Sequence, residues 1–544
     1  MAVDLDGTLL SRGRVAAAVI DAIKQVQQDG LRAVLVTGRI GAELEAEFPD
    51  LAGVFDAVIL ENGAMCVVEG DRTALAPPVD TTLDDALAAR GIPYRRGEVL
   101  LASDSEHAVA IAEAIAELGL DCQIVHNRAA LMVLPAGVTK GTGLEALLAT
   151  MKLSPHNALA VGDAENDLAL FAVAEIGVAV ANAIPSVQRH ADLVLEKSNG
   201  AGVVELLTGP ILSLTRRWCP PRRWIGIGAF DDGTPAQVPG SQARIMVTGP
   251  AGSGKSYLVG LMAERWIEAG YSVIVLDPEG DHLELQHLNQ VQTVVVRDPL
   301  PEPAEMLETL HPRASLVVDL SALDKAQKID YLQRMRLAAE VHREISGFPH
   351  WVVYDEAHLL GPDEQAPWTR RGGYVLSSFT PAAFPASEIY SAEVVLELPS
   401  PDGSEPPLIS PPARRATVRV GSDPARPFII ADRRTAHVRH RHKYADVSLP
   451  KHRRFYFRTT DGHPAPVAGT MHEFHTAISH LDPQALEYHL QRGDLSRWLR
   501  DIIADKNLAD QVAAWEDELQ AHRAADLERI RRELGKAIDD RYLS

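Results

Sequence analysis

The stretch AVDLDGTLL (residues 2–10) decides the fold of the first part of the chain. Asp4 and Asp6 stand two positions apart, so both carboxylates lie on one face of a strand, and Gly7 and Thr8 then allow a turn. Two carboxylates this close repel each other unless a cation intervenes or one of them holds a proton. The pair therefore predicts phosphoryl transfer, in which one carboxylate attacks phosphorus and the other moves a proton.

Three further motifs follow in chain order, each at an expected strand end or helix start. VLVTGR (34–39) places Thr37 at a strand end, KGTGLEALL (140–148) begins a helix with Lys140, and AVGDAENDLALF (160–171) carries Asp163, Asn166 and Asp167. The Thr37 hydroxyl and the Lys140 ammonium at its helix N-terminus are suited to bind a phosphate. The side-chain oxygens of Asp163, Asn166 and Asp167 are hard ligands suited to Mg²⁺. Each residue has an ordinary structural explanation by itself, but together they predict one phosphoryl-transfer site.

Short apolar runs alternate with helical patterns along residues 1–208, which predicts a parallel α/β sheet. Strands are expected at 33–36, 58–60, 159–161 and 178–180. The residues 209–223 are rich in Pro, Trp and Arg and are expected to form a linker. A second α/β series follows over 224–444, with strands expected at 244–247, 273–276, 315–318 and 351–354. Residues 445–544 are expected to be mostly helical, ending in a charged helix near 516–539.

The first series closely resembles the haloacid-dehalogenase-like phosphatases, in particular their Cof-type branch, over residues 1 to about 208. The resemblance implies a Rossmann-like core with a small α+β cap at about 73–134, including helices near 81–90 and 105–119. A small cap favours small phosphorylated metabolites over macromolecules. Because only three residues precede Asp4, either the first strand is short or the start is truncated.

The same resemblance implies a role for each motif residue. Asp4 would be the nucleophile that forms an aspartyl-phosphate, Asp6 the general acid/base, Thr37 a phosphate ligand and Lys140 the cation that balances charge. Mg²⁺ would be held by Asp4, Asp163 and the backbone carbonyl of Asp6, with Asn166 and Asp167 in support.

GPAGSGKS (249–256) fits the P-loop pattern between an apolar strand and a helix. Its glycines, Gly249, Gly252 and Gly254, would let backbone N–H groups surround the phosphates of ATP. Lys255 would reach the β- and γ-phosphates and Ser256 would bind Mg²⁺. HWVVYDEAH (350–358) is a buried strand ending in Asp355, suited to the second shell of that Mg²⁺, and Glu356, suited to polarising a water.

This second half resembles the HerA/FtsK-type ATPases over about 222–440, which implies a RecA-like P-loop α/β domain. The segment VLDPEGDHLEL (275–285) and the hairpin-like GIGAFDDGTPAQV (226–238) add to the likeness. Three features differ: the chain before the P-loop is too short for a β-barrel, the usual Gln sensor is replaced by SSF (377–379), and no arginine finger is evident, with Arg370 and Arg371 as candidates.

The net charge of −21 argues against a general nucleic-acid binder, but residues 410–460 hold 13 Lys and Arg against 3 Asp, a local charge of +10. This block indicates either a phosphate-rich partner or a solvated, internally paired face. Three scattered cysteines, no signal peptide and no apolar run of about 18 residues predict a cytoplasmic protein without a membrane partner.

The leading hypothesis is a Mg²⁺-dependent phosphatase with a fused ATPase that regulates or assembles it. One alternative is an enzyme that processes nucleic-acid ends, and another is a nucleotide-gated scaffold with a vestigial site. Because related ATPases complete their sites across subunits, we also expect a homo-oligomer, a hexamer before other sizes, with a monomer or dimer as the alternative.

Overall fold

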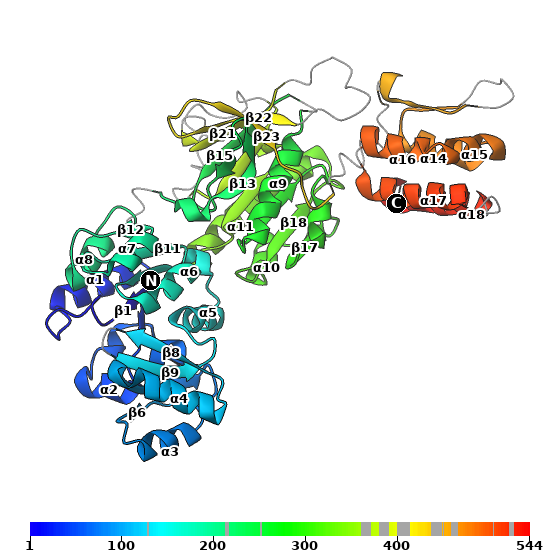
Figure 1. The fold of residues 1–544 in the computed structure, drawn as a ribbon. Helices are drawn as coiled ribbons and strands as arrows, with labels where there is room; N and C mark the ends of the chain where they lie inside the picture. The colour runs from blue at the N-terminus through cyan, green and yellow to red at the C-terminus, as the bar shows by residue number, and fades with distance from the viewer. Residues whose placement is uncertain are drawn as a thin grey trace. The chain divides into compact units, whose positions relative to one another are not determined.

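The computed structural model describes the 544 residues except 128–129, 213–216, 251–252, 361–371, 380–390, 400–413, 437–448, 450, 459–465, 504, 522–526 and 544. The chain forms two compact units (Figure 1). The first comprises Met1–Trp224 with Ser346–Phe348, and the second comprises Ile225–Ile345 with Pro349–Ser544.

An eight-stranded sheet lies at the centre of the first unit, in the order β12-β11-β10-β1-β2-β3-β4-β5. The strands from β12 to β3 are parallel, and β4 and β5 are antiparallel. Their bounds are β1 Ala2–Asp4, β2 Val34–Val36, β3 Ala57–Leu60, β4 Met65–Val68, β5 Asp71–Ala74, β10 Leu159–Gly162, β11 Ile176–Ala179 and β12 Leu193–Val194. The helices are α1 Ala17–Gln28, α2 Gly41–Glu47, α5 Lys140–Thr150, α6 Leu168–Val173, α7 Pro185–His190 and α8 Asn199–Leu207. This arrangement confirms the predicted Rossmann-like core.

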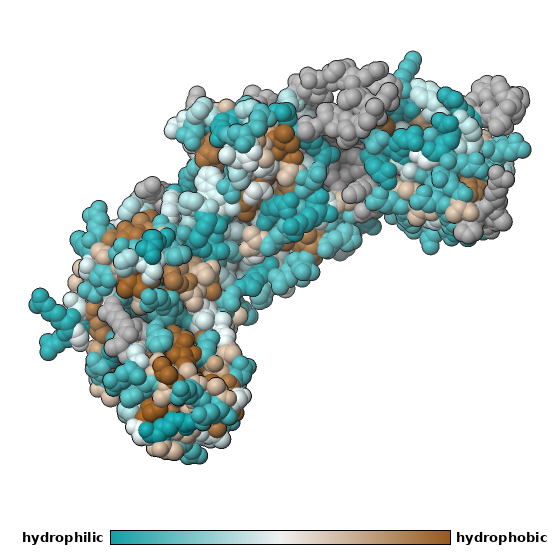
Figure 2. All heavy atoms as spheres, in the orientation of Figure 1, coloured by the Kyte–Doolittle hydropathy of each residue, from teal (hydrophilic) through white to brown (hydrophobic). Residues whose placement is uncertain are grey.

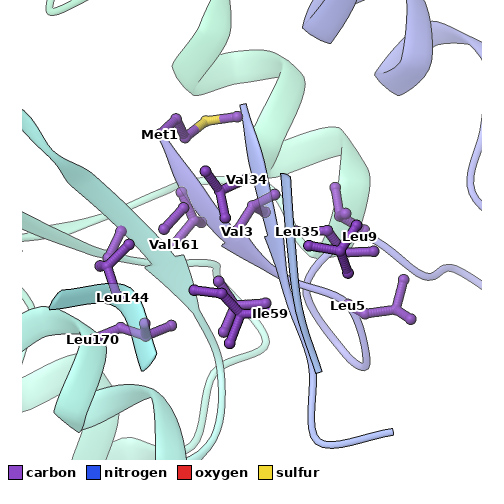
Figure 3. Packing of buried hydrophobic residues seen from close by; sticks show 14 of the residues in the cluster. Met1, Val3, Leu5, Leu9, Val34, Leu35, Ile59, Leu144, Val161 and Leu170 are labelled. Atoms are coloured by element: carbon purple, nitrogen blue, oxygen red, sulfur yellow. The ribbon is translucent and has the colours of Figure 1, made fainter. Parts of the chain in front are cut away.

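The first strand is short but central. It pairs on one side with β10 and on the other with β2. Val3 and Leu5 are fully buried, and Figure 3 shows Val3 beside Val34 and Val161, the side chains of the neighbouring strands. Burial of each such side chain stabilises the fold by about 1.5–3 kcal/mol. Asp4, which lies between these two anchors, is therefore held firmly at the end of the strand.

The cap is a separate four-stranded antiparallel sheet in the order β6-β7-β9-β8. Its elements are α3 Thr82–Ala89, β6 Arg95–Arg96, β7 Leu101–Asp104, α4 Ala108–Leu118, β8 Cys122–Asn127 and β9 Ala130–Pro135. Both predicted cap helices are present and pack on the sheet around a core of their own that includes Leu83, Ile111 and Leu131. The residues 71–74 belong to β5 of the main sheet, so the cap begins after the expected residue 73.

The described end of the expected linker packs on the first unit. Pro221–Arg223 form a short 3-10 helix in which Arg222 Nη2 lies 2.7 Å from Asp192 Oδ2. Arg223 donates to the Ala174 carbonyl at 2.6 Å. The first compact unit accordingly extends to Trp224.

The second unit contains an eleven-stranded sheet in the order β14-β13-β23-β22-β21-β15-β20-β19-β16-β18-β17. The strands from β21 to β17 are parallel, whereas β22, β23, β13 and β14 add antiparallel strands at one edge. Their bounds are β13 Ile225–Phe230, β14 Pro235–Val238, β15 Arg244–Thr248, β16 Val273–Asp277, β17 Val291–Val295, β18 Ser315–Asp319, β19 Trp351–Tyr354, β20 Tyr374–Ser378, β21 Val394–Glu397, β22 Arg415–Val420 and β23 Arg426–Ile430. The four strands predicted from the sequence are all present.

The α-helices with described bounds between β13 and β23 are α9 (Lys255–Glu268), α10 (Pro303–Glu308) and α11 (Lys325–Ser346). Helix α9 packs on the sheet through two stacked indoles. The rings of Trp266 on α9 and Trp351 on β19 lie 3.9 Å apart between centroids. Their ring nitrogens donate to the carbonyls of Pro239 and Gly240. The stack therefore fixes the helix that follows the P-loop against the strand that delivers Asp355.

Between Arg414 and Arg434, the arginines of the basic block at 410–460 contact their own domain; Arg419, for example, donates to the Gly421 carbonyl at 2.7 Å. Arg433 is buried beside Glu264 on α9, which also accepts hydrogen bonds from the backbone N–H groups of Arg434 and Thr435. Arg414 lies 3.6 Å from the ring centroid of Tyr257. Others pair with acids: Arg415 with Asp231, Arg426 with Asp232 and Arg434 with Glu268. This part of the block is largely internally paired.

The last part of the chain is a helical region with a small hairpin. Its elements are β24 Phe455–Tyr456, β25 Val467–Ala468, α14 Met471–His480, α15 Pro483–Gln491, α16 Asp494–Trp498, α17 Lys506–Ala521 and α18 Leu527–Ile538. The charged segment near 516–539 thus contributes to two helices.

In the part of the chain with described coordinates, no helix combines the length and apolarity needed to cross a membrane. The face of the molecule drawn in Figure 2 mixes hydrophilic residues with scattered hydrophobic ones.

Candidate active sites

Asp4 lies at the end of β1 with Lys140, the first residue of α5. Lys140 Nζ is 2.6 Å from Asp4 Oδ1 and 2.7 Å from Asp167 Oδ1, and all three side chains are buried. Asp163 follows β10, and its Oδ1 accepts a hydrogen bond from Thr8 Oγ1 at 3.1 Å. Carboxylate oxygens of Asp4, Asp163 and Asp167 all lie within 4.8 Å of one another. Residues up to 163 positions apart thus meet at one edge of the sheet.

The charges of this cluster do not balance, since three buried carboxylates surround one ammonium. Burial raises the pKa of Asp4 well above its usual range, Asp167 raises it further, and Lys140 opposes both. Burial lowers the pKa of Lys140, but Asp167 and Asp4 outweigh it and the pKa is raised. An additional cation would favour the charged form of all three carboxylates.

The donor set fits Mg²⁺, which prefers hard oxygen ligands. Besides the carboxylates, Asn166 Oδ1 is buried and has no hydrogen-bond partner among the described residues. Asn166 Nδ2 donates to Asn62 Oδ1 at 3.1 Å, which turns the amide oxygen away from that contact. Asp167 differs from the others, because its Oδ1 contacts Lys140 and its Oδ2 accepts from the backbone of residues 163 and 164.

Asp6 is half-exposed and held by a residue to which no role was assigned from the sequence. Arg39 donates to both of its carboxylate oxygens, from Nε at 2.9 Å and from Nη2 at 2.8 Å. Arg39 also contacts Glu47, and its backbone N–H donates to the hydroxyl of the buried Thr37 at 3.2 Å. Its position two residues after Thr37 in VLVTGR was the available signal.

The turn at Glu61–Gly63 joins the core, the cap and α5. All three residues have positive φ, and a Cβ on Gly63 would lie 1.9 Å from the Thr139 carbonyl oxygen, so only glycine fits there. The buried Glu61 carboxylate accepts backbone hydrogen bonds from Glu98, Val99 and Leu100 at 2.8–2.9 Å. The turn therefore sets the start of α5, where Lys140 lies. In the sequence, ENGA (61–64) is only a further likeness to the phosphatase family and does not reveal this role.

The P-loop follows β15 and leads into α9. Gly249 and Gly254 adopt φ of 156° and 103°, which only glycine adopts readily. Lys255 is buried, and its Nζ donates to the carbonyls of Gly249 at 3.0 Å and Pro250 at 3.3 Å. Gly252 lies outside the described residues. The Lys255 side chain thus folds back onto the P-loop, a position from which its ammonium can reach a bound phosphate.

Asp355 at the end of β19 is buried against His282, whose Nε2 lies 2.9 Å from Asp355 Oδ2. Burial opposes the charge, but the hydrogen bond and charge of His282, together with the Ser256 hydroxyl, lower the pKa of Asp355 to about 2. Asp277 at the end of β16 accepts backbone N–H groups of residues 279–282 and so folds the loop that presents His282. The acids of this loop stand out in the sequence, whereas the histidine between them and Leu283 does not.

Glu356 has a positive φ of 52° and is the next residue along. Burial, and then the charge of Asp355, raise its pKa to about 7, while Lys255 opposes them. Ser377 and Ser378, at the expected sensor position, are buried at the end of β20, beside Val247 and Thr248 of β15. Arg370 and Arg371 lie outside the described residues.

Comparison with known proteins finds a family match in each of the two α/β parts of the chain. Residues 1–83 and 96–207 match the family model of haloacid dehalogenase-like hydrolases, and residues 242–346 match the central domain of helicase HerA. The phosphoglycolate phosphatase of Archaeoglobus fulgidus is 32% identical over 219 residues, which cover 38% of this chain and 94% of that protein. Phosphoglycolate phosphatase 2 of Saccharolobus solfataricus is 36% identical over 184 residues, covering 32% of this chain and 75% of that protein.

Among solved structures, a haloacid dehalogenase-like hydrolase from Bacillus subtilis is 21% identical, with a TM-score of 0.33 and coverage of 38% of this chain and 97% of that one. Through its first unit, this chain belongs to the haloacid dehalogenase-like hydrolases. It is a phosphatase of that family fused to a HerA-type ATPase domain.

Proposed function

We propose that the chain is a Mg²⁺-dependent phosphatase that removes phosphate from a small metabolite through an aspartyl-phosphate on Asp4. The observation that supports this most is the buried contact of Lys140 with both Asp4 and Asp167. It holds a carboxylate at the strand end where a phosphate, a cation and a second acid can meet. Because two relatives are phosphoglycolate phosphatases, 2-phosphoglycolate is the first substrate to test.

In the proposed reaction, a carboxylate oxygen of Asp4 forms a bond to phosphorus while the bond from phosphorus to the ester oxygen breaks. Asp6 gives a proton to the departing oxygen. A water then attacks phosphorus and gives its proton to Asp6, the bond to Asp4 breaks, and inorganic phosphate leaves. Because Arg39 occupies both oxygens of Asp6, the Asp6–Arg39 pair has to open for each proton transfer.

The other residues position the phosphate and its charge. The Thr37 hydroxyl would donate to a phosphate oxygen, and Lys140 would hold Asp4 in place. Asp4, Asp163, the Asp6 carbonyl and Asn166 would hold Mg²⁺, with Asp167 in support. Bound Mg²⁺ would supply positive charge that offsets the negative charge gathering on the phosphate oxygens.

We further propose that the P-loop domain binds ATP and that this regulates or assembles the phosphatase. Lys255 and Ser256 would contact the phosphates and their Mg²⁺, Asp355 would support the metal, and Glu356 would orient the attacking water. The pKa of Glu356, raised to about 7, suits a general base near neutral pH.

A phosphatase panel on the full chain tests both proposals. It would compare 2-phosphoglycolate, sugar phosphates and nucleoside monophosphates, each with Mg²⁺ or with EDTA, and each with or without a non-hydrolysable ATP analogue. We expect phosphate release that needs Mg²⁺. The analogue should change the rate of release in the unchanged chain, but should not change it in Lys255→Ala. Release that persists in EDTA would contradict the first proposal. A rate that does not respond to the analogue would contradict regulation of the phosphatase by ATP and leave the first proposal standing.

A further inference from the structure

The C-terminal helical region holds a cavity of about 380 Å³ that neither the phosphatase nor the ATPase uses. One wall is the segment 454–458 around β24, and the other runs from Tyr488 on α15 to Ile502 beyond α16. The segment from Tyr488 to Leu499 has no role in either proposed reaction. A concave space between two walls with polar side chains is the usual form of a small-ligand site.

The cavity is rich in arginine. Arg454, Arg458, Arg492 and Arg497 line it, against two acidic side chains, one of which is Asp494. Asp494 is already shared, with Arg492 at 3.4 Å and Arg497 at 3.5 Å. The guanidinium of Arg458 has no hydrogen bond or ion pair with any residue that the structure describes. The lining therefore carries more positive charge than its own acids can offset.

Aromatic rings lie among these arginines. Tyr456 is 54% exposed, and its hydroxyl donates to the Lys451 carbonyl at 2.7 Å, which limits its rotation. Arg492 lies over the ring of Tyr488, 5.3 Å from the centroid. The exposed ring of Tyr456 beside these arginines provides a face on which a flat ligand ring can stack.

The two walls are held together by buried contacts, so the cavity exists before a ligand arrives. His489 is 3% exposed, its Nδ1 lies 3.0 Å from Asp494 Oδ2, and its Nε2 accepts the backbone N–H of Arg458 at 2.9 Å. Trp498 Nε1 donates to the Arg453 carbonyl at 2.9 Å. A preformed site loses little freedom when it binds.

From this lining we infer that the cavity binds a mononucleotide: a flat ring that stacks on the exposed Tyr456, and a phosphate that the arginines bind. A guanidinium group can donate two parallel hydrogen bonds to two oxygens of one phosphate, and this geometry makes arginine selective for phosphate. A volume near the lower end of the usual 300–1,000 Å³ range suits one nucleotide and not a polymer. The site would report nucleotide supply to the chain independently of the P-loop.

Calorimetry on the full chain tests the site, with Lys255→Ala and Asp4→Asn present throughout to silence the P-loop and the phosphatase. The titrants are AMP, ribose 5-phosphate, inorganic phosphate and a single-stranded oligonucleotide of about ten nucleotides. We expect saturable binding of AMP, weakened about tenfold or more by Arg458→Gln with Arg492→Gln. The matched control is Arg500→Gln, because Arg500 pairs with Asp510 on the same region and does not line the cavity.

The ring is tested by Tyr456→Ala, which should weaken AMP and leave ribose 5-phosphate unchanged. Equal melting curves for all variants would show that the region still folds. The inference is overturned if AMP does not saturate the chain, or if Arg500→Gln weakens it as much as the double variant. It is also overturned if the oligonucleotide binds more than tenfold tighter than AMP, or if Tyr456→Ala leaves AMP affinity unchanged.

Discussion

At the scale of single residues, Asp4 is defined by what surrounds it: an ammonium at 2.6 Å and two other buried carboxylates. Asparagine has nearly the same shape and keeps the strand, but its amide is no nucleophile. We expect Asp4→Asn to reduce phosphate release to background, while Asp6→Asn, which removes the proton carrier and its ion pair with Arg39, should slow it by about 10²–10⁴. Mg²⁺-dependent release would be measured beside nucleotide binding, which should not change. Appreciable turnover in Asp4→Asn would rule out this nucleophile.

At the scale of elements, Asp56, which directly precedes β3, connects the end of α1 to the start of β2. Its carboxylate accepts from Gln27 at 2.9 Å, the Ala33 N–H at 2.8 Å and Arg32 at 2.9 Å. Burial opposes its charge, but these bonds outweigh it and lower the pKa of Asp56. A lowered folded pKa means that the stabilisation is complete above the unfolded value of about 3.9 and is lost as the pH falls through the folded value.

We therefore expect Asp56→Asn to weaken this region by roughly 1–2 kcal/mol at pH 7. The difference from the unchanged protein should shrink as the pH falls below about 4. Hydrogen exchange of the amides at 33–36, compared between variants at each pH, measures it. Asp29→Asn, an exposed neighbour, is the control. A difference that grows towards acid would contradict the assignment.

Glu61 belongs to the same scale, because it joins the core turn to three successive backbone N–H groups at the entry to β7. In Glu61→Gln the amide nitrogen would face donors, at a cost of about 1.5–3 kcal/mol. We expect faster exchange at 98–100 and a lower phosphatase rate, since the turn also seats α5 and Lys140. Glu113→Gln on the exposed face of α4 should do neither. If both variants behaved alike, the turn would have no special role.

At the scale of the whole molecule, each unit has its own hydrophobic core. Lys255→Ala should weaken nucleotide binding, and Glu356→Gln should retain ATP but block its hydrolysis. Neither should abolish Mg²⁺-dependent phosphate release from the metabolite, because the phosphatase residues all lie in the first unit. Nucleotide affinity, ATPase rate and phosphatase rate would be measured on the same samples. Unfolding of the phosphatase by Lys255→Ala would disprove the division.

The assembled state is the other prediction at this scale. We expect a hexamer, about six times the 59.0 kDa chain, because the ATPases that this half resembles complete their sites with a neighbour's arginine, and repeated contacts of that kind close into a ring. Light scattering with and without ATP, at two salt concentrations, measures it. A monomer under every condition would rule out the ring. The internal pairing of Arg415, Arg426 and Arg434 leaves fewer arginines of the block for such a contact.

The sequence alone was enough for the two α/β folds and for the parallel strands that carry the motifs at their ends. These depend on local regularities: apolar periodicity marks each strand, and glycine or a short acidic pattern marks the turn after it. Parallel strands end at one edge of a sheet, so Asp4, Lys140 and Asp163 could be grouped from their motifs. The sequence predicts a cap that starts at about 73, and β5 (Asp71–Ala74) continues the core sheet to that point by a pairing that no local pattern reveals.

Only the tertiary structure decided which polar groups share a buried environment. The contacts of Arg39 with Asp6, Asn62 with Asn166 and His282 with Asp355 join residues 33, 104 and 73 positions apart. Composition gave the basic block a charge of +10 but could not tell Arg433, buried against Glu264, from Arg458 in an open cavity. Charges pair where packing removes water from both partners at once, and packing depends on the whole fold.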